Sequence, residues 1–318
     1  MNLKPITLIA CLILTLHSLA QPLIKQRDGR EPFVDSLMRQ MPLKAKVGQL
    51  LMIAADSEDN KAKTEKLIRT IDSCQVGGVC FFKGKQSAVL MLTNLISQRP
   101  NLPLFYAMDA EWGLGMRMDD GYFFPRALAL GALDLRDTTL LYNMGINIAK
   151  QCIELGININ FAPSLDINLN YLNPIINSRS FGEDKQRVAV LSSYYIKGLQ
   201  SQGVMAVAKH FPGHGDTEQD SHLDLPLISH SRAFIDSVDA FPFKYNIQRG
   251  LWGVMAAHLA IPALSCDSVI NEQLRPASLN ECVISDYLIK DLQFKGLIFT
   301  DGLNMKGITK GYSSGTAA

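Results

Sequence analysis

The residues best suited to chemistry lie between Lys209 and Pro226, in the stretch "KHFPGHGDTEQDSHLDLP". Three histidines and three aspartates fall within these eighteen residues, and the prolines and glycines among them exclude a long helix. Side chains of these types could bind a metal ion, transfer protons to and from a substrate, or form a polar turn.

A metal site here would use histidines and carboxylates on and after this stretch, namely His210, His214, His222, His230, Asp216 and Asp220. Their spacing contains no H-x-H, no H-E-x-x-H and no short histidine–carboxylate pair on one helix face. We therefore predict neither a metal ion nor an organic cofactor. The simplest interpretation of His210 is a strand-end residue hydrogen-bonded within the site, and that of His230 is a surface or helix-start residue.

Asp220 and His222 form the central "DSH" of the stretch. A carboxylate two residues away in a loop can accept a hydrogen bond from one imidazole nitrogen and orient the other toward a substrate. It also favours the protonated ring, which could then give a proton to a leaving oxygen near neutral pH. A single Asp-x-His is common by chance, so the pair alone decides nothing.

Asp301, in "IFTDGLNM", stands where an apolar run breaks into a turn that contains glycine. By composition alone, its simplest role is to cap the helix that follows. If it faces a general acid across a pocket, it could instead attack a sugar carbon as a nucleophile.

Seven short apolar runs must position these residues: Val47–Ala55, Gly77–Phe82, Pro103–Ala110, Ile157–Ile167, Val204–Phe211, Trp252–Ile261 and Gly296–Leu303. They are continuous rather than alternating, as expected for strands of a parallel sheet that is buried on both faces. Helical patterns lie between them, and those at 139–156 and 187–203 each close on a glycine suited to a helix C-terminus.

Repeated strand–helix units predict either a doubly wound sheet or a (β/α)8 TIM-type barrel. Polar residues gather at the carboxyl ends of the runs: Asp109, Glu111, Asp166, Lys209, His210, His258 and Asp301. In a barrel all these ends meet at one mouth, whereas a doubly wound sheet would spread them along an edge and usually shows an early G-x-G-x-x-G loop. The pattern favours an α/β barrel, and after the seventh strand only "KGITKGYSSGTAA" remains, so we expect it to be incomplete.

Residues 1–20 differ from the rest, with Lys4 before an apolar run and small residues before Gln21. This pattern predicts a secretory signal peptide that is cleaved after Ala20, and therefore a periplasmic or secreted protein whose mature part is a single domain, 21–318. The run is too short to span a membrane comfortably. A lipid anchor at Cys11, after "LIA", is the second possibility.

The remaining composition excludes other classes of protein. The formal charge is +1, from 31 basic and 30 acidic residues, so nothing attracts a nucleic acid. An apolar content of 47% excludes disorder. The mature chain has five cysteines without paired spacing, which predicts core residues rather than a disulfide framework.

Several of these segments resemble glycoside hydrolase family 3, and within it the β-N-acetylglucosaminidase branch. The resemblance extends from "LMRQMPLKAKVGQLLM" at Leu37 to "FTDGLNMKGI" at Ile308, and "KHFPGHGDTEQDSH" is its most specific part. The family's acid/base histidine and its aspartate partner fall on His222 and Asp220, and its nucleophile falls on Asp301.

The resemblance also implies which residues bind the sugar: Asp109 and Arg117 in "MDAEWGLGMRM", Arg179 in "NSRSFGED", and Lys209 and His210 in "AKHFPG". Charged donors and acceptors suit a neutral sugar with many hydroxyls. Without the resemblance, a surface ion pair would be the simpler reading of either arginine. This chain departs from the family's pattern at Trp112, which could stack on a sugar or alter the pocket wall, and it lacks the eighth strand and helix, which leaves edges on the first and seventh strands.

The resemblance therefore predicts a retaining β-N-acetylglucosaminidase that acts on saccharides of cell-wall (peptidoglycan) turnover, with a small saccharide as its partner. Three alternatives stay open. A phosphorylase of the same family would use phosphate in place of water, a truncated saccharide-binding domain would bind without turnover, and a metal hydrolase would lose activity with a chelator. A β-glucosidase fits less well, because that branch lacks the "GHGDT…DSH" loop.

Overall fold

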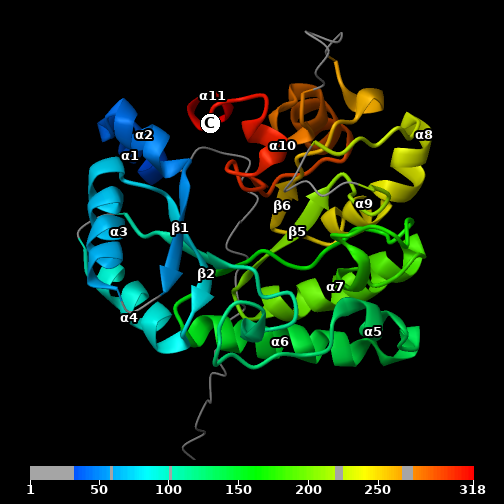
Figure 1. Cartoon of the computed structure of the whole chain (residues 1–318), viewed down its shortest axis with the longest axis horizontal. Coiled ribbons are helices and arrows are strands. Elements are labelled where there is room, and N and C mark those ends of the chain that lie inside the picture. Colours follow the sequence, from blue (N-terminus) through cyan, green and yellow to red (C-terminus); the bar gives the residue numbers. More distant parts are fainter. Residues whose placement is uncertain (1–31, 58–59, 100–101, 219–224, 267–274) are drawn as a thin grey trace, which may run out of the picture.

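The computed structural model describes residues 32–57, 60–99, 102–218, 225–266 and 275–318. Its strands form one parallel sheet in chain order: β1 (Met52–Ser57), β2 (Gly78–Gly84), β3 (Phe105–Met108), β4 (Ile159–Asn160), β5 (Met205–Phe211), β6 (Gly253–Ala256) and β7 (Leu297–Thr300). The order never reverses, which excludes a doubly wound sheet. The strands curl around a common axis and the helices lie outside them, so the predicted barrel-type fold is confirmed (Figure 1).

Helices cover the outside of the sheet (Figure 1). They are α1 (Pro32–Gln40), α2 (Leu43–Gln49), α3 (Lys61–Cys74), α4 (Gln86–Ser97), α5 (Ala127–Gly131), α6 (Thr138–Glu154), α7 (Lys185–Ser201), α8 (Arg232–Phe234), α9 (Phe241–Ile247), α10 (Lys306–Thr309) and α11 (Ser314–Ala317). The short helical segments are η1 (Leu114–Met116), η2 (Leu135–Asp137), η3 (Asn177–Arg179), η4 (Ile235–Asp239), η5 (Pro262–Leu264), η6 (Ala277–Leu279) and η7 (Cys282–Asp291). None of the described helices is long and apolar enough to cross a membrane.

Local sequence explains where the two long central helices begin and end. The Asp184 side chain accepts a hydrogen bond from the Arg187 backbone N–H at 2.7 Å and caps the start of α7. Gly156 and Gly203 follow α6 and α7 with φ of +75° and +85°, a conformation that glycine adopts without strain. Both predicted helices are therefore confirmed.

Two hydrophobic layers hold the fold together. Side chains of the strands and of the residues next to them form one cluster inside the barrel: Cys80, Ala107, Ile159, Phe161, Met205, Val207, Trp252 and Met255. A larger cluster lies between the strands and the helices. Strands β5 and β6 are wholly buried, whereas β7 is half-buried to exposed. Within the described residues, β1 pairs only with β2 and β7 only with β6, so the predicted edges are present.

Several predicted strand boundaries are wrong. The sixth strand ends at Ala256 and not at Ile261, and the seventh ends at Thr300 and not at Leu303. The first strand begins at Met52 and not at Val47, because residues 43–49 form α2. The fourth strand comprises only Ile159 and Asn160, which pair with β3 on one side and β5 on the other, and the chain then continues as a loop that contacts β5 again through a bridge from Ser164 to Lys209.

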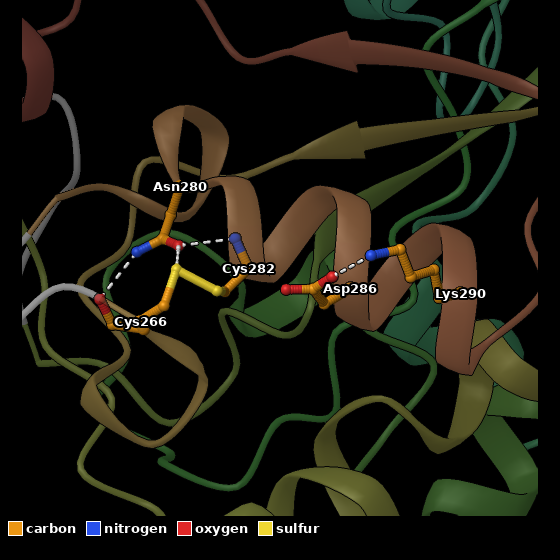
Figure 2. The surroundings of a disulfide bond; sticks show 6 residues. Cys266, Asn280, Cys282, Asp286 and Lys290 are labelled. Carbon is orange, nitrogen blue, oxygen red and sulfur yellow. Dashed lines mark hydrogen bonds and ion pairs between the residues drawn. A yellow bond between two sulfur atoms is a disulfide. The ribbon is translucent and has the colours of Figure 1, made fainter.

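The prediction that the cysteines are unpaired is wrong for Cys266 and Cys282, which form a disulfide (Figure 2). Their Cα atoms are 5.7 Å apart although the two residues are 16 apart in sequence. The buried Asn280 supports the bridge: its side chain donates to Ser265 Oγ at 2.8 Å and accepts from the Cys282 backbone N–H at 3.0 Å. Cys80 and Cys152 are free and buried, as predicted.

Candidate active site

Five charged side chains meet at the carboxyl ends of β3 and β5. Lys209 Nζ lies 2.6 Å from Asp109 Oδ1 and 2.8 Å from Glu111 Oε1. Arg117 donates to the other oxygen of Asp109 at 2.5 Å, and Arg179 donates to Glu111 through both Nε and Nη2. Four of the predicted sugar-binding residues therefore lie in one buried cluster, and the simpler surface ion pairs are excluded for both arginines.

The cluster is stable because each charge has an opposite charge beside it. Burial alone would raise the pKa values of Asp109 and Glu111, but the charge of Lys209, with Arg117 beside Asp109 and Arg179 beside Glu111, lowers both. Burial alone would lower the pKa of Lys209, and the two carboxylates raise it instead. All five groups are therefore charged at neutral pH and present fixed hydrogen-bonding groups to the mouth of the barrel.

His210 completes this group through Asp166, which is fully buried in the loop that follows β4. Asp166 accepts from His210 Nδ1 at 2.7 Å and from the His214 backbone N–H at 2.7 Å. Arg179 Nη2 lies 3.3 Å from His210 Nε2, and since a guanidinium can only donate, Nε2 accepts and Nδ1 carries the proton. The expected strand-end hydrogen bonding of His210 is confirmed.

Asp301 follows β7 at the same end of the barrel. Its backbone N–H donates to Ala256 O at 3.0 Å, and its carboxylate is half-buried. Burial lowers the pKa values of His258 and of His214, that of His214 to about 4, and the negative charge of Asp301 acts in the opposite direction on both. Asp301 therefore faces the same mouth as the residues that end β5 and β6. It does not cap the next helix, because α10 begins after Met305 and the carboxylate instead accepts from the Gly302 N–H.

Asp220 and His222 lie outside the described residues, so their predicted roles stay predictions. Asp216 precedes these two residues in the sequence and His230 follows them, and the side chains of Asp216 and His230 are in contact. The Nε2 atom of His230 lies 2.8 Å from Asp216 Oδ2 and its Nδ1 lies 2.8 Å from Asp239 Oδ2. His230 directly precedes Ser231, the N-cap of α8, so its interpretation as a helix-start residue is confirmed, whereas a simple surface position is wrong because the fold places a carboxylate on each ring nitrogen.

Among the described residues, no three histidine, cysteine, aspartate or glutamate side chains are grouped as a metal site would require. The imidazoles of His210 and His230 hydrogen-bond to carboxylates, and His214 Nδ1 lies 2.7 Å from Thr217 Oγ1. Trp112 belongs to the wall behind the cluster, where the guanidinium of Arg126 covers its ring at 4.6 Å.

Comparison with known proteins identifies the family to which this site belongs. The model of the "Glycosyl hydrolase family 3 N terminal domain" matches residues 42–318. The chain belongs to glycosyl hydrolase family 3. Among curated family 3 relatives, it is 34% identical over 260 residues to the beta-hexosaminidase A of Pseudoalteromonas piscicida, covering 77% of this chain and 44% of that protein. It is 33% identical over 239 residues to a beta-hexosaminidase of Nitrosomonas eutropha, covering 73% of this chain and 66% of that protein.

Solved family 3 structures agree. A β-N-acetylglucosaminidase from Paenibacillus sp. superposes with a TM-score of 0.78 at 37% identity, over 87% of this chain and 52% of that one. NagZ from Neisseria gonorrhoeae, solved with N-trifluoroacetyl-D-glucosamine, gives a TM-score of 0.68 at 28% identity, over 80% of this chain and 74% of that one. The beta-glucoside phosphorylase BglX, at 24% identity and a TM-score of 0.83, shares the fold. This chain spans between about half and two thirds of the curated relatives described above.

Three residues of this family 3 site received no role from the sequence: Glu111, Asp166 and His258. Each had one usable signal, a polar side chain just after an apolar run. That signal does not show that Glu111 joins Arg179 to Lys209, or that Asp166 orients His210, because those partners are 44 to 98 residues away in sequence.

Proposed function

We propose that this family 3 domain is a retaining β-N-acetylglucosaminidase that releases terminal β-linked N-acetylglucosamine. The observation that carries the proposal is the half-buried Asp301 carboxylate, at the same mouth as the buried cluster of Asp109, Glu111 and Lys209. The names of the relatives, beta-hexosaminidase and β-N-acetylglucosaminidase, support the choice of N-acetylhexosamine.

In the proposed mechanism, Asp301 attacks the anomeric carbon while His222, oriented by Asp220, protonates the leaving oxygen. A covalent glycosyl-enzyme forms with inversion at that carbon. His222 then takes a proton from water, which attacks the same carbon and releases Asp301 with a second inversion, so the configuration is retained. The side chains of Asp109, Arg117, Arg179, Lys209 and His210 bind the hydroxyls and the acetamido group of the sugar.

The test is release of nitrophenol from an aryl β-N-acetylglucosaminide, with the aryl β-glucoside as the control for the acetamido group. Wild-type chain should prefer the first substrate, and Asp301→Asn should lose the activity while still binding N-acetylglucosamine in calorimetry. Binding by the wild-type chain without any release would identify a saccharide-binding domain instead. A sugar 1-phosphate as the product in phosphate buffer would identify a phosphorylase.

We further propose that the protein is exported and acts on cell-wall-derived saccharides. Two observations support export: the lysine and apolar run of residues 1–20, and the Cys266–Cys282 disulfide, a bond that persists in oxidising compartments. Mass spectrometry of the protein recovered from the cells of origin would test this. A chain that begins at Gln21 is expected, a lipid on Cys11 would identify the alternative anchor, and an intact Met1 in the cytoplasm would refute export.

A further inference from the structure

We propose that His258 is a positioning residue for Asp301 and acts through the carbonyl oxygen of Gly302. This rests on the proposed function, since only there does Asp301 attack a substrate. His258 lies two residues beyond the end of β6, and Asp301 lies one residue beyond the end of β7. The two strands are paired from Gly253 with Leu297 to Ala256 with Thr300, which brings the segments that follow them side by side.

The hydrogen bonds of His258 define which of its nitrogens carries the proton. Its Nε2 lies 3.0 Å from Gly302 O, and a carbonyl oxygen can only accept, so Nε2 is protonated. Its Nδ1 lies 2.7 Å from Ser278 Oγ. Burial lowers the pKa of His258, which is fully inaccessible to solvent, so the ring is neutral and Nδ1 accepts from the Ser278 hydroxyl. The Gly302 carbonyl thus fixes the tautomer, and Ser278 supports it by donating to Nδ1.

Ser278 is itself held in place. Its backbone N–H donates to Ala257 O at 3.1 Å, next to His258 in the chain, and the neighbouring Ala277 N–H donates to Leu259 O at 2.7 Å. The titratable groups that act on the His258 ring are Asp301, which favours its protonation, and His210, which opposes it. The His258 ring therefore contacts Ser278 on one side and the turn at Asp301 and Gly302 on the other.

Gly302 connects this support to the carboxylate. Its N–H donates to Asp301 Oδ1 at 2.8 Å, and its carbonyl accepts from His258. The orientation of that residue's two peptide groups therefore sets the rotation of the Asp301 side chain. Within the part of the chain that the structure describes, the Asp301 carboxylate makes no other hydrogen bond through its side-chain oxygens, so this contact is its positional restraint.

The consequence for the reaction follows from the geometry of attack. A displacement of about 1 Å in a reacting group can reduce the rate by about 10²-fold. Loss of the His258 bond frees the Gly302 peptide to rotate and carry the carboxylate with it, while the sugar-binding cluster of Asp109, Glu111 and Lys209 stays intact. The effect should therefore fall on kcat and spare KM.

The experiment compares three variants and one control variant in the nitrophenol assay. His258→Gln places an amide N–H near the position of Nε2 and should keep kcat within about 3-fold of wild type, whereas His258→Asn is too short and should lower kcat by about 10- to 100-fold with KM unchanged. Ser278→Ala removes the hydrogen-bond donor to Nδ1 and should give an intermediate loss. Asn246→Leu removes a buried polar side chain between α7 and α9 and controls for lost stability, since it should lower the melting temperature and leave kcat unchanged.

A second readout does not depend on turnover. The ¹⁵N chemical shifts of the His258 ring should show a neutral Nε2–H tautomer from pH 6 to pH 8. An Nδ1–H tautomer, or a His258→Asn variant with wild-type kcat, would overturn the positioning role alone. A wild-type chain that releases no nitrophenol would instead overturn the proposed function, and the positioning role with it.

Discussion

Replacement of Glu111 by glutamine tests the charge balance of the site. The cluster has two carboxylates, Asp109 and Glu111, and three cations, Lys209, Arg117 and Arg179, so its formal charge is +1. Glu111→Gln raises this to +2 and removes the carboxylate that Arg179 and Lys209 share, although the amide oxygen is still able to accept one hydrogen bond.

Removal of one partner from a buried ion pair typically destabilises a protein by about 3–5 kcal/mol. For a domain of this size, each kcal/mol lowers the melting temperature by about 2 °C, so we expect a fall of about 6–10 °C at pH 7. The matched control is Asp286→Asn, which breaks an exposed pair with Lys290 and should leave the melting temperature unchanged. A fall of less than about 2 °C for Glu111→Gln would refute the inference that the ion pairs of Glu111 with Arg179 and Lys209 stabilise the fold.

The effect of Glu111→Gln on the unfolding free energy should depend on pH. The charges of Arg179 and Lys209 hold the pKa of Glu111 well below its ordinary value of about 4.3, against the opposing effect of burial. The stability that this carboxylate contributes is therefore complete above that ordinary value and is lost as the pH falls toward the folded-state pKa. The difference in unfolding free energy between wild type and Glu111→Gln should narrow below about pH 4, and a difference that does not change with pH would contradict the assignment.

Three further predictions concern other parts of the molecule. His222→Ala should lower kcat by about 10²–10⁴-fold on a substrate with a poor leaving group and much less on a dinitrophenyl glycoside, and equal losses on both would exclude His222 as the acid. The variant Cys266→Ser should lose about 3 kcal/mol of unfolding free energy in urea, the value for closing a loop of about 15 residues, and reductant should then destabilise wild type but not the variant. Burial alone would lower the pKa of His230, but the hydrogen bonds that its ring donates to Asp239 and Asp216 raise it. Its contribution to stability is therefore complete below about pH 6.5 and is lost as the pH rises through the raised pKa. Denaturation of His230→Gln at pH 5 to 9 should lack this loss, and an unchanged pH profile would refute the double ion pair.

The sequence alone was sufficient to predict where the strands lie and which ends bear polar residues. Strands buried on both faces, such as β5 and β6, need continuous apolar runs, and all seven segments have such a run although β7 is half-buried to exposed. The apolar pattern was less informative at the first and fourth strands. Residues 47–51 are as apolar as a strand but belong to α2 and its C-terminal turn, and only two residues of the run from Ile157 to Ile167 pair as β4.

The pairings between distant residues were decided only by the tertiary structure. Lys209 and Asp109 are 100 residues apart in sequence, His258 and Gly302 are 44 apart, and Cys266 and Cys282 meet although their spacing matches no motif. Residue type indicates that a charge or a thiol is available, but burial and the position of a partner determine its pKa, its tautomer and its bond. Those depend on which strands and loops the barrel brings together, because electrostatic and hydrogen-bond energies act over a few ångströms in space and not along the chain.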